Sequence, residues 1–493
     1  MLLLGAALRL AMLPGATLGY DGLQSVTHAA RGIPTGILSA FLHDPHPPLY
    51  YALLAFWLRL GSSDAAILLL SVLLSLLAVA SVHHVARLRD GPRVAALAAL
   101  VLALDPFALH WSVHARMYAL VMLLSVWAWH LASRLAEGSR SPAHFLGAVT
   151  AELTLLYSHV AAPFFLACIL AAGVPDLVRH REARRRWLTA QTIVALGALP
   201  SLFFAAKTSQ EHMKRPGPGD LAQALALFTS GVDPAPAWLV PLGAAAFAAV
   251  AACLLLRRRD RALAVGLLVL PFAIAVLASH AIRPIWYAPR LFAFVTPFFA
   301  LALARLLLGP AGAARRGRER AVAAGALLLL AVGCVTTVRT PLREERFVDA
   351  VALVRAHALP NDLVVVPTLK DKWALAWYAM GPEWSRGAVR AGGVETLKRV
   401  VRGEERRALL AELARYGRDA AGEPFGIAPV DDLQPADLAR AGRVWIVARS
   451  TAAADALDAR LGARTLESFE VRGLVVRVLD SPRPASVDSR TGS

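Results

Sequence analysis

The sequence predicts an all-α polytopic membrane domain over residues 1–338, followed by a small extracytoplasmic α/β domain over residues 339–480. Of its 493 residues, 57% are hydrophobic and only 18% are charged, which is far from the composition of a soluble domain. Apolar runs long enough to cross a hydrocarbon core of about 30 Å recur up to residue 338 and then stop. Residues 481–493 are polar and are predicted to be a disordered tail.

Eleven apolar segments are predicted to span the membrane. The first contains Arg9 and lacks both a basic leader and a cleavage pattern, so it is interpreted as a membrane helix and not as a cleaved signal peptide. The segments are 2–19, 65–86, 94–111, 117–133, 143–157, 162–178, 187–206, 237–256, 262–279, 291–308 and 321–338.

Basic residues in the connections predict the orientation of these spans. Eighteen arginines fall within the 33 residues of one set of alternate connections, at 87–93, 134–140, 179–186, 257–261 and 315–320. Only 8 lysines and arginines fall within the 100 residues of the other set, at 20–64, 111–118, 157–162, 207–236 and 280–290. Because basic connections stay in the cytoplasm, the N-terminus is predicted to lie inside and the C-terminal domain outside the bacterial inner membrane.

The net charge of +17 does not indicate a nucleic-acid partner, because most of it lies in these short arginine clusters. The cysteines Cys168, Cys253 and Cys334 fall within apolar runs and show no disulfide or metal spacing.

One apolar run, at 48–60, is too short to span and is predicted to be an interfacial helix on the outer surface. Counting it as a span would move every later arginine cluster to the outside.

In the C-terminal region, 362–367 and 443–450 are predicted strands, and 346–358 and 406–417 are predicted amphipathic helices.

Four polar stretches lie in connections predicted to face outward. Structural interpretations stay open: Asp21 can cap a helix, prolines after His46 can stiffen a loop, and Arg116 or Arg290 can reach lipid headgroups. His114 can be a solvated loop residue. However, all four stretches are predicted to lie on the same side of the membrane, which favours one outward-facing cleft that contains a carboxylate and several cations. The stretches are TLGYDG (17–22), HDPHPPLYY (43–51), DPFALHWSVHARMYAL (105–120) and RPIWYAPRLFAF (283–294).

At these positions the chain resembles the GT-C superfamily of membrane glycosyltransferases. It is most similar to bacterial relatives of protein O-mannosyltransferases, to aminoarabinose transferases and to lipopolysaccharide-core galacturonosyltransferases. The resemblance covers about residues 1–340 and implies a GT-C-like fold and transfer of a hexosyl or pentosyl sugar from a polyprenyl-phosphate donor. The matching residues are Asp21, His46-Pro47-Pro48-Leu49, Ser112, Ala115-Arg116-Met117-Tyr118-Ala119-Leu120 and Pro289-Arg290-Leu291.

These residue types suit that chemistry. An acceptor hydroxyl that attacks the anomeric carbon needs a base, for which Asp21 is the main candidate and Asp44 the second. A single carboxylate base opposite a phosphate site implies one displacement with inversion. Candidates to bind the phosphate of the donor are His46, Arg116 and Arg290. Candidates to bind other parts of the substrate are His114, Tyr118 and Arg283.

Two departures from the family pattern bear on metal binding. The usual Asp-Glu pair is Asp21-Gly22 here, and the usual glutamate before Ala-Arg is His114. Each departure removes a carboxylate, so no cofactor is expected and a divalent metal is not favoured. Should a metal bind, its ligands are expected among Asp44, His43 and His46.

Other function classes stay open. A secondary transporter or a flippase of envelope precursors would suit many spans, but transporters place ionisable residues at the membrane midplane and in repeated halves, which are not visible here. A scaffold whose outer domain binds a partner is a further possibility. Neither GxGxxG nor a P-loop is present, so a nucleotide-sugar donor lacks its usual signature. The acceptor is expected to be an envelope lipid, glycan or protein, and the sugar stays open.

Overall fold

A computed structural model describes most of the chain, and within it the chain divides into two compact units. The first comprises Met1–Ala16, Ala40–Tyr50 and Ala65–Pro341, and the second comprises Thr17–Ser39, Tyr51–Asp64 and Leu342–Ser493. The described residues are 1–207, 213–231, 235–286, 289–309, 313–339, 346–359, 361–380, 425–433, 438, 441–462, 464–471 and 473–480.

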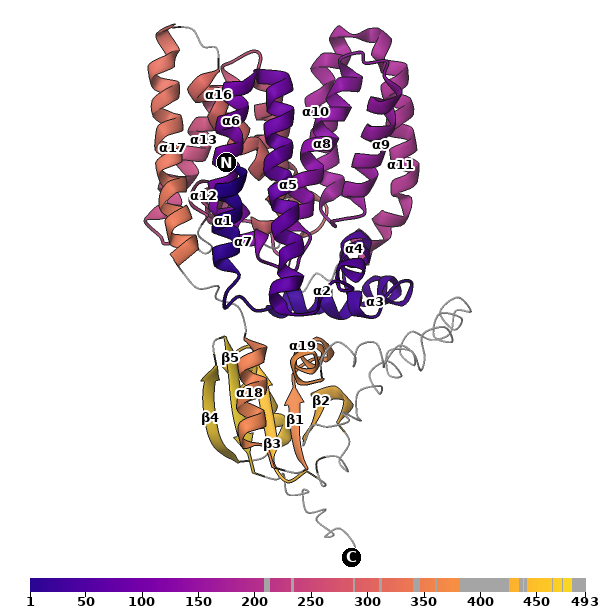
Figure 1. The fold of residues 1–493 in the computed structure, drawn as a ribbon, viewed down its shortest axis with the longest axis vertical. Helices are drawn as coiled ribbons and strands as arrows, with labels where there is room; N and C mark the ends of the chain where they lie inside the picture. The colour runs from indigo at the N-terminus through magenta and orange to yellow at the C-terminus, as the bar shows by residue number, and fades with distance from the viewer. Residues whose placement is uncertain are drawn as a thin grey trace, which may run out of the picture. The chain divides into compact units, whose positions relative to one another are not determined.

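Helices occur at every one of the eleven predicted membrane segments, and the longer ones run side by side (Figure 1). Six helices in the described part are long and apolar enough to cross a membrane, or seven with one bent pair. The chain is therefore an integral membrane protein, whereas eleven crossings stay a prediction. The helices are α1 (Leu2–Met12), α5 (Asp64–Asp90), α6 (Pro92–Leu104), α7 (Pro106–Ser112), α8 (Tyr118–Ala136), α9 (Pro142–Leu156), α10 (Ala162–Arg179), α11 (Arg184–Lys207), α13 (Leu239–Leu255), α14 (Arg261–Leu263), η2 (Ala264–Val269), α15 (Leu270–Ala281), η3 (Pro289–Val295), α16 (Thr296–Leu308) and α17 (Ala313–Arg339).

The connections that are predicted to face outward hold more helix than the sequence predicted. The interfacial segment 48–60 forms α4 (Leu49–Trp57), but α2 (Tyr20–Ala30), α3 (Thr35–His43) and α12 (Pro218–Ser230) were not predicted. The first predicted span, 2–19, is also wrong in length, since α1 ends at Met12 before a Pro-Gly pair. Asp21 consequently lies in the first turn of a separate helix, α2, and not at the end of helix one.

The third predicted span is broken into α6 and α7, which meet at an angle of 56°. Pro106 has no N–H with which to continue α6. Buried Arg9 donates from Nη1 to the free carbonyl of Ala103 at 2.9 Å, and the Asp105 carboxylate accepts the N–H of Ala108 at 2.8 Å. The break is thus hydrogen-bonded on both sides, and α7 is directed toward the turn that carries His114 and Arg116.

Buried ion pairs join the helix ends that carry the predicted cytoplasmic connections. Arg305 of α16 contacts Asp90 at the end of α5 at 2.8 Å and Asp260 at 3.0 Å. Arg257 contacts Asp260 at 3.6 Å and Glu319 of α17 at 2.5 Å. Arg257, from one of the arginine clusters, and Arg305, from a predicted span, therefore hold helix ends together.

The second unit contains a five-stranded sheet in the order β2-β1-β3-β5-β4. Strands β2, β1 and β3 are parallel, whereas β5 is antiparallel to β3 and β4. The predicted strands 362–367 and 443–450 are β1 (Asp362–Val366) and β3 (Val444–Ala448). The predicted helix 346–358 is α18 (Phe347–His357), while the predicted helix 406–417 and the tail 481–493 lie outside the described residues. The other elements are α19 (Leu369–Met380), β2 (Phe425–Pro429), α24 (Thr451–Leu461), β4 (Thr465–Val471) and β5 (Leu474–Leu479).

Helix α19 holds the connection that contains α2. Tyr378 donates its hydroxyl hydrogen to Asp64 at 2.8 Å and accepts the N–H of Leu18 at 3.1 Å, so it bridges the two ends of that connection. The guanidinium of Arg449 lies 3.7 Å from the ring centroid of Tyr20, the residue before Asp21. Residues before α5 and residues of the C-terminal region consequently pack as one unit.

Candidate functional site

The HPP segment forms a fixed turn in the first unit. The Asp44 carboxylate accepts the backbone N–H of His46 at 2.9 Å, and two prolines follow His46. The N–H of Leu49 donates to the carbonyl of Tyr157 at 3.1 Å. The turn is therefore held against the connection between α9 and α10.

Arg116 joins this turn from the connection between α7 and α8. Its Nη1 lies 3.7 Å from Oδ2 of Asp44, and the two side chains are 6% and 2% exposed. This buried ion pair orients the guanidinium, whose planar fork of N–H donors is of the type that suits phosphate oxygens.

An aromatic and histidine cluster lies beside the ion pair. The ring of Trp111 lies 4.4 Å from that of Tyr118 and 4.6 Å from that of His114, and the guanidinium of Arg290 lies 5.7 Å from its centroid. His114 is tied by Nδ1 to the carbonyl of His110 at 2.7 Å. Arg290, from η3, thus meets the segment that carries His114 and Tyr118.

His159 belongs to the same cluster and was not predicted from the sequence. Its ring lies 4.8 Å from His46 and 5.8 Å from Tyr118, and the residue is 1% exposed. Burial, together with the positive charges of His46, Arg116 and Arg290, holds the pKa of His159 well below its usual range, and the Asp44 carboxylate opposes this only in part. The neutral imidazole is therefore the form present at pH 7.

Three of the four predicted stretches meet in this cluster. They contribute Asp44 and His46, then His114, Arg116 and Tyr118, and finally Arg290. Asp21 belongs to the second unit, and its place in the same cleft as the cluster stays a prediction. Arg283 follows α15, where its N–H donates to the carbonyl of Ala278 at 3.1 Å, and its part in substrate binding also stays a prediction.

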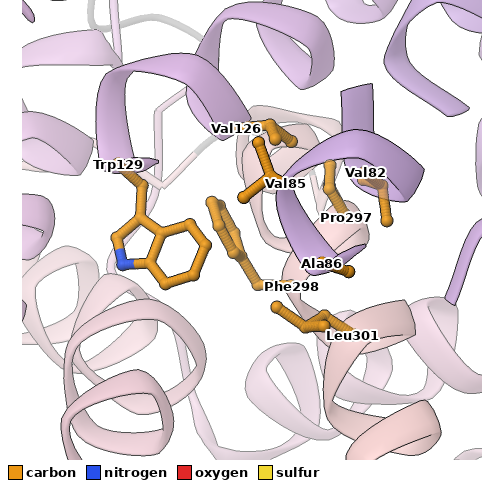
Figure 2. Close-up of a pocket in the computed structure, with 8 residues that line it drawn as sticks. All are labelled: Val82, Val85, Ala86, Val126, Trp129, Pro297, Phe298 and Leu301. Atoms are coloured by element: carbon orange, nitrogen blue, oxygen red, sulfur yellow. The ribbon is translucent and has the colours of Figure 1, made fainter. Parts of the chain in front are cut away.

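A separate pocket inside the helical unit has a different character (Figure 2). The rings of Trp129 and Phe298 meet there edge to face, 5.4 Å apart. Because only apolar side-chain surface and the indole ring line it, this pocket offers no base and no phosphate ligand. Its lining comes from α5, α8 and α16 and consists of Val82, Val85, Ala86, Val126, Trp129, Pro297, Phe298 and Leu301.

No group of three or more histidine, cysteine or carboxylate side chains suited to a metal ion occurs among the described residues. The side chain of His43, one of the alternative metal ligands, is not among those described. Cys168 and Cys253 are buried, Cys334 is half-buried, and all three are free thiols.

Part of this cluster lies in a segment that is similar to a known protein family. Residues 45–206, which contain the HPP turn, Arg116 and His159, match the family model of dolichyl-phosphate-mannose-protein mannosyltransferases. ArnT from Cupriavidus metallidurans bound to undecaprenyl phosphate has a similar structure, with a TM-score of 0.54 and 14% identity over 96% of each chain. This chain therefore contains a segment similar to that family, and its fold is similar to that of ArnT, a GT-C glycosyltransferase.

Two further GT-C structures are similar. Apo ArnT from the same organism gives a TM-score of 0.53 at 13% identity over 96% of each chain. The oligosaccharyltransferase AglB from Archaeoglobus fulgidus, in complex with an inhibitory peptide and a dolichol-phosphate, gives 0.47 at 13% identity, over 77% of this chain and 63% of AglB. No curated protein sequence matched. At these identities the structural likeness shows the GT-C fold.

Proposed function

We propose that this protein is an inverting glycosyltransferase that moves a sugar from a polyprenyl-phosphate donor to an envelope acceptor at the outer face of the inner membrane. The observation that carries the proposal is the meeting of Arg116, Arg290 and His46 beside one buried turn. Two guanidiniums and an imidazole suit a phosphate dianion that is released at a membrane boundary. The family match and the likeness to ArnT bound to undecaprenyl phosphate support a lipid phosphate as donor.

In the proposed reaction, the acceptor hydroxyl oxygen bonds to the anomeric carbon while the bond from that carbon to the phosphate oxygen breaks. Asp21 takes the hydroxyl proton, and the polyprenyl phosphate leaves with the electron pair. Arg116 and Arg290 stabilise the charge that grows on the departing phosphate. Because the sugar is displaced once, its anomeric configuration inverts.

Asp44 has a different part in this mechanism. Its Oδ1 accepts the backbone N–H of His46 and its Oδ2 faces the guanidinium of Arg116, so both oxygens are already engaged within the turn. We assign Asp44 to orienting Arg116 and His46, and Asp21 to proton removal. Tyr118 and Trp111 supply the apolar walls that ligand sites commonly place around a few polar groups.

The test is sugar transfer by the purified protein in lipid nanodiscs, with polyprenyl-phosphate sugars as donors and envelope extract as acceptor. Asp21→Asn is expected to lose most transfer while it accumulates normally, and Asp176→Asn, at the end of α10, serves as the control. Undiminished transfer by Asp21→Asn would remove Asp21 as the base. Absence of transfer from any lipid-linked sugar by the wild type would contradict the function itself.

We also propose that transfer needs no divalent metal, since Gly22 and His114 replace two carboxylates of the family pattern. Transfer is expected to continue in EDTA. Full loss on chelation, restored by manganese or magnesium, would contradict this proposal.

A further inference from the structure

His159 has a polar atom that the fold itself does not use. The residue lies in the short connection between α9 and α10, and only 1% of it is exposed. Its Nδ1 faces the backbone N–H of Ala161 at 3.0 Å. A backbone N–H can only donate, so Nδ1 must be the acceptor, and the neutral ring carries its hydrogen on Nε2.

The Nε2–H of His159 is buried, and no acceptor for it occurs among the described residues. Buried donors in folded proteins nearly always have an acceptor, and those that lack one mark a place where a ligand or water binds. Protonation of the ring would not remove this hydrogen, so a donor is present at Nε2 in either state.

The surroundings of this donor select an anion as its acceptor. The ring of His159 contacts the rings of His46 and Tyr118. It also lies close enough to Arg116 and Arg290 for their positive charges to act on it. The Asp44 carboxylate is the one negative group among these neighbours, and it is already held by Arg116 and by the N–H of His46. An anion placed among the two guanidiniums would therefore accept from Nε2 as well.

We infer that His159 is a further ligand of the donor phosphate, with Nε2–H donating to one phosphate oxygen between Arg116 and Arg290. This inference rests on the proposed function and specifies the phosphate-binding site. A neutral donor adds a hydrogen bond to the phosphate without adding another positive charge to a crowded cluster. The connection between α9 and α10 thereby becomes part of the site, although it carries no basic residue apart from His159.

Two substitutions separate the hydrogen bond from the ring. The amide nitrogen of glutamine reaches the position of Nε2, whereas asparagine reaches only the position of Nδ1. His159→Gln is expected to bind sugar-free polyprenyl phosphate within about threefold of the wild type. His159→Asn is expected to bind it about tenfold more weakly, the usual effect of losing a hydrogen bond to a charged group. His180→Asn, in a predicted cytoplasmic connection, is the control and should bind as the wild type does.

Binding is measured by titration of polyprenyl phosphate into the purified full chain in nanodiscs, with thermal unfolding to verify the fold of each variant. Equal binding by His159→Asn and the wild type would overturn the inference. Equal loss in both variants would also overturn it, because the ring and not the N–H would then matter. A wild type that does not bind the lipid would overturn the proposed function and the inference together.

Inorganic phosphate, titrated in the same way, distinguishes a free ion from a lipid-linked one. It is expected to bind far more weakly than the lipid, and equal affinity would overturn a lipid phosphate as the ligand. If His159→Asn does not accumulate, the ¹⁵N signal of Nε2 in the histidine-labelled wild type, assigned by its loss in His159→Gln, gives the result. That signal is expected to shift on addition of the lipid, and an unchanged signal would overturn the inference.

Discussion

The residues of the candidate site act through partners that come from distant parts of the sequence. Asp44 illustrates this, because its carboxylate holds both the N–H of His46, two residues away, and the guanidinium of Arg116. The first contact is local and follows from the Asp-Pro-His spacing. The second depends on how the connection between α7 and α8 approaches the HPP turn.

Arg290 tests whether the shape of a cation matters at this site. Arg290→Ala is expected to lower kcat/KM for the lipid-linked donor more than Arg290→Lys, since lysine keeps the charge and loses the planar fork. We expect roughly tenfold between the two variants, in line with a charge-assisted hydrogen bond. The measurement is initial transfer rate against donor concentration. Equal and small losses would show that Arg290 only anchors the chain at the membrane surface.

His159 also predicts a pH dependence of stability. Its pKa in the folded chain lies well below 6.5, so the unfolded chain binds more protons as the pH falls through that value. The free energy of unfolding therefore falls below about pH 6.5, by at most about 1.4 kcal/mol per pH unit for this group. The wild-type Tm is expected to drop more between pH 7.5 and pH 5.5 than that of His159→Gln. Parallel curves would contradict the prediction.

Sequence reasoning found most of this cluster and missed His159 for a physical reason. Basic residues beside HPP and ARMYAL patterns indicate phosphate chemistry by their type and spacing. A lone histidine in a six-residue connection has no periodicity, and its burial and its orphaned Nε2–H appear only when the neighbouring turns are in place. The position between two spans on the predicted outer side was the one available signal.

At the scale of elements, apolar length located the helices but could not show how each one ends or bends. Residues 94–111 read as one apolar span, yet the Asp105-Pro106 pair within them is a helix start signal and divides α6 from α7. Arg9, which looked like an interruption of the first span, completes the hydrogen bonding of that break. Helix α2 was missed because its polar residues suggest a solvated loop, although they are buried against other parts of the second unit.

Two glycines of α17 predict how tightly this helix packs. A Cβ at Gly333 would overlap the carbonyl oxygen of Ser230 and lie 3.0 Å from Cγ of Pro106, whereas a Cβ at Gly325 meets nothing within 4 Å. Gly333→Ala is expected to destabilise the protein by about 1–3 kcal/mol, and Gly325→Ala to leave it unchanged or slightly more stable. Thermal unfolding in detergent measures both. A Gly333→Ala variant as stable as Gly325→Ala would mean that α17 shifts freely.

The hydrogen bonds of Tyr378 lead us to predict that the C-terminal region stabilises the connection that carries Asp21. Tyr378→Phe removes the hydrogen bonds to Asp64 and Leu18 while it keeps the ring. We expect a loss of stability of about 1–2 kcal/mol and earlier proteolysis within residues 17–64. Limited proteolysis with mass spectrometry detects this, and Tyr157→Phe, which loses a hydrogen bond to Gly197 in the first unit, is the control. An unchanged cleavage pattern in Tyr378→Phe would contradict this support.

At the scale of the whole molecule, arginines occur both in the connections between spans and in buried ion pairs. The number of arginines in one set of connections predicts that this set lies in the cytoplasm. Arg257 and Arg305 instead sit in buried ion pairs with Asp90, Asp260 and Glu319. Composition leads to a prediction of sidedness, but it does not indicate which cations hold helix ends together, because pairing depends on side chains from four separate helices and their connections.

The predicted sidedness can be tested directly, since the proposed site needs all of its stretches on the outer face. In a chain without its native cysteines, single cysteines at Glu182 and Gly317 are expected to react with a membrane-impermeant maleimide only in inverted vesicles. Cysteines at Arg215 and Ala459 are expected to react in intact cells. All four positions are exposed, so access of the reagent depends on the side of the membrane and not on burial. The expectation follows from 18 arginines in 33 residues against 8 lysines and arginines in 100. Labelling of position 182 in intact cells would reverse the orientation and place the phosphate-binding cluster on the cytoplasmic side, where an outward transfer reaction could not occur.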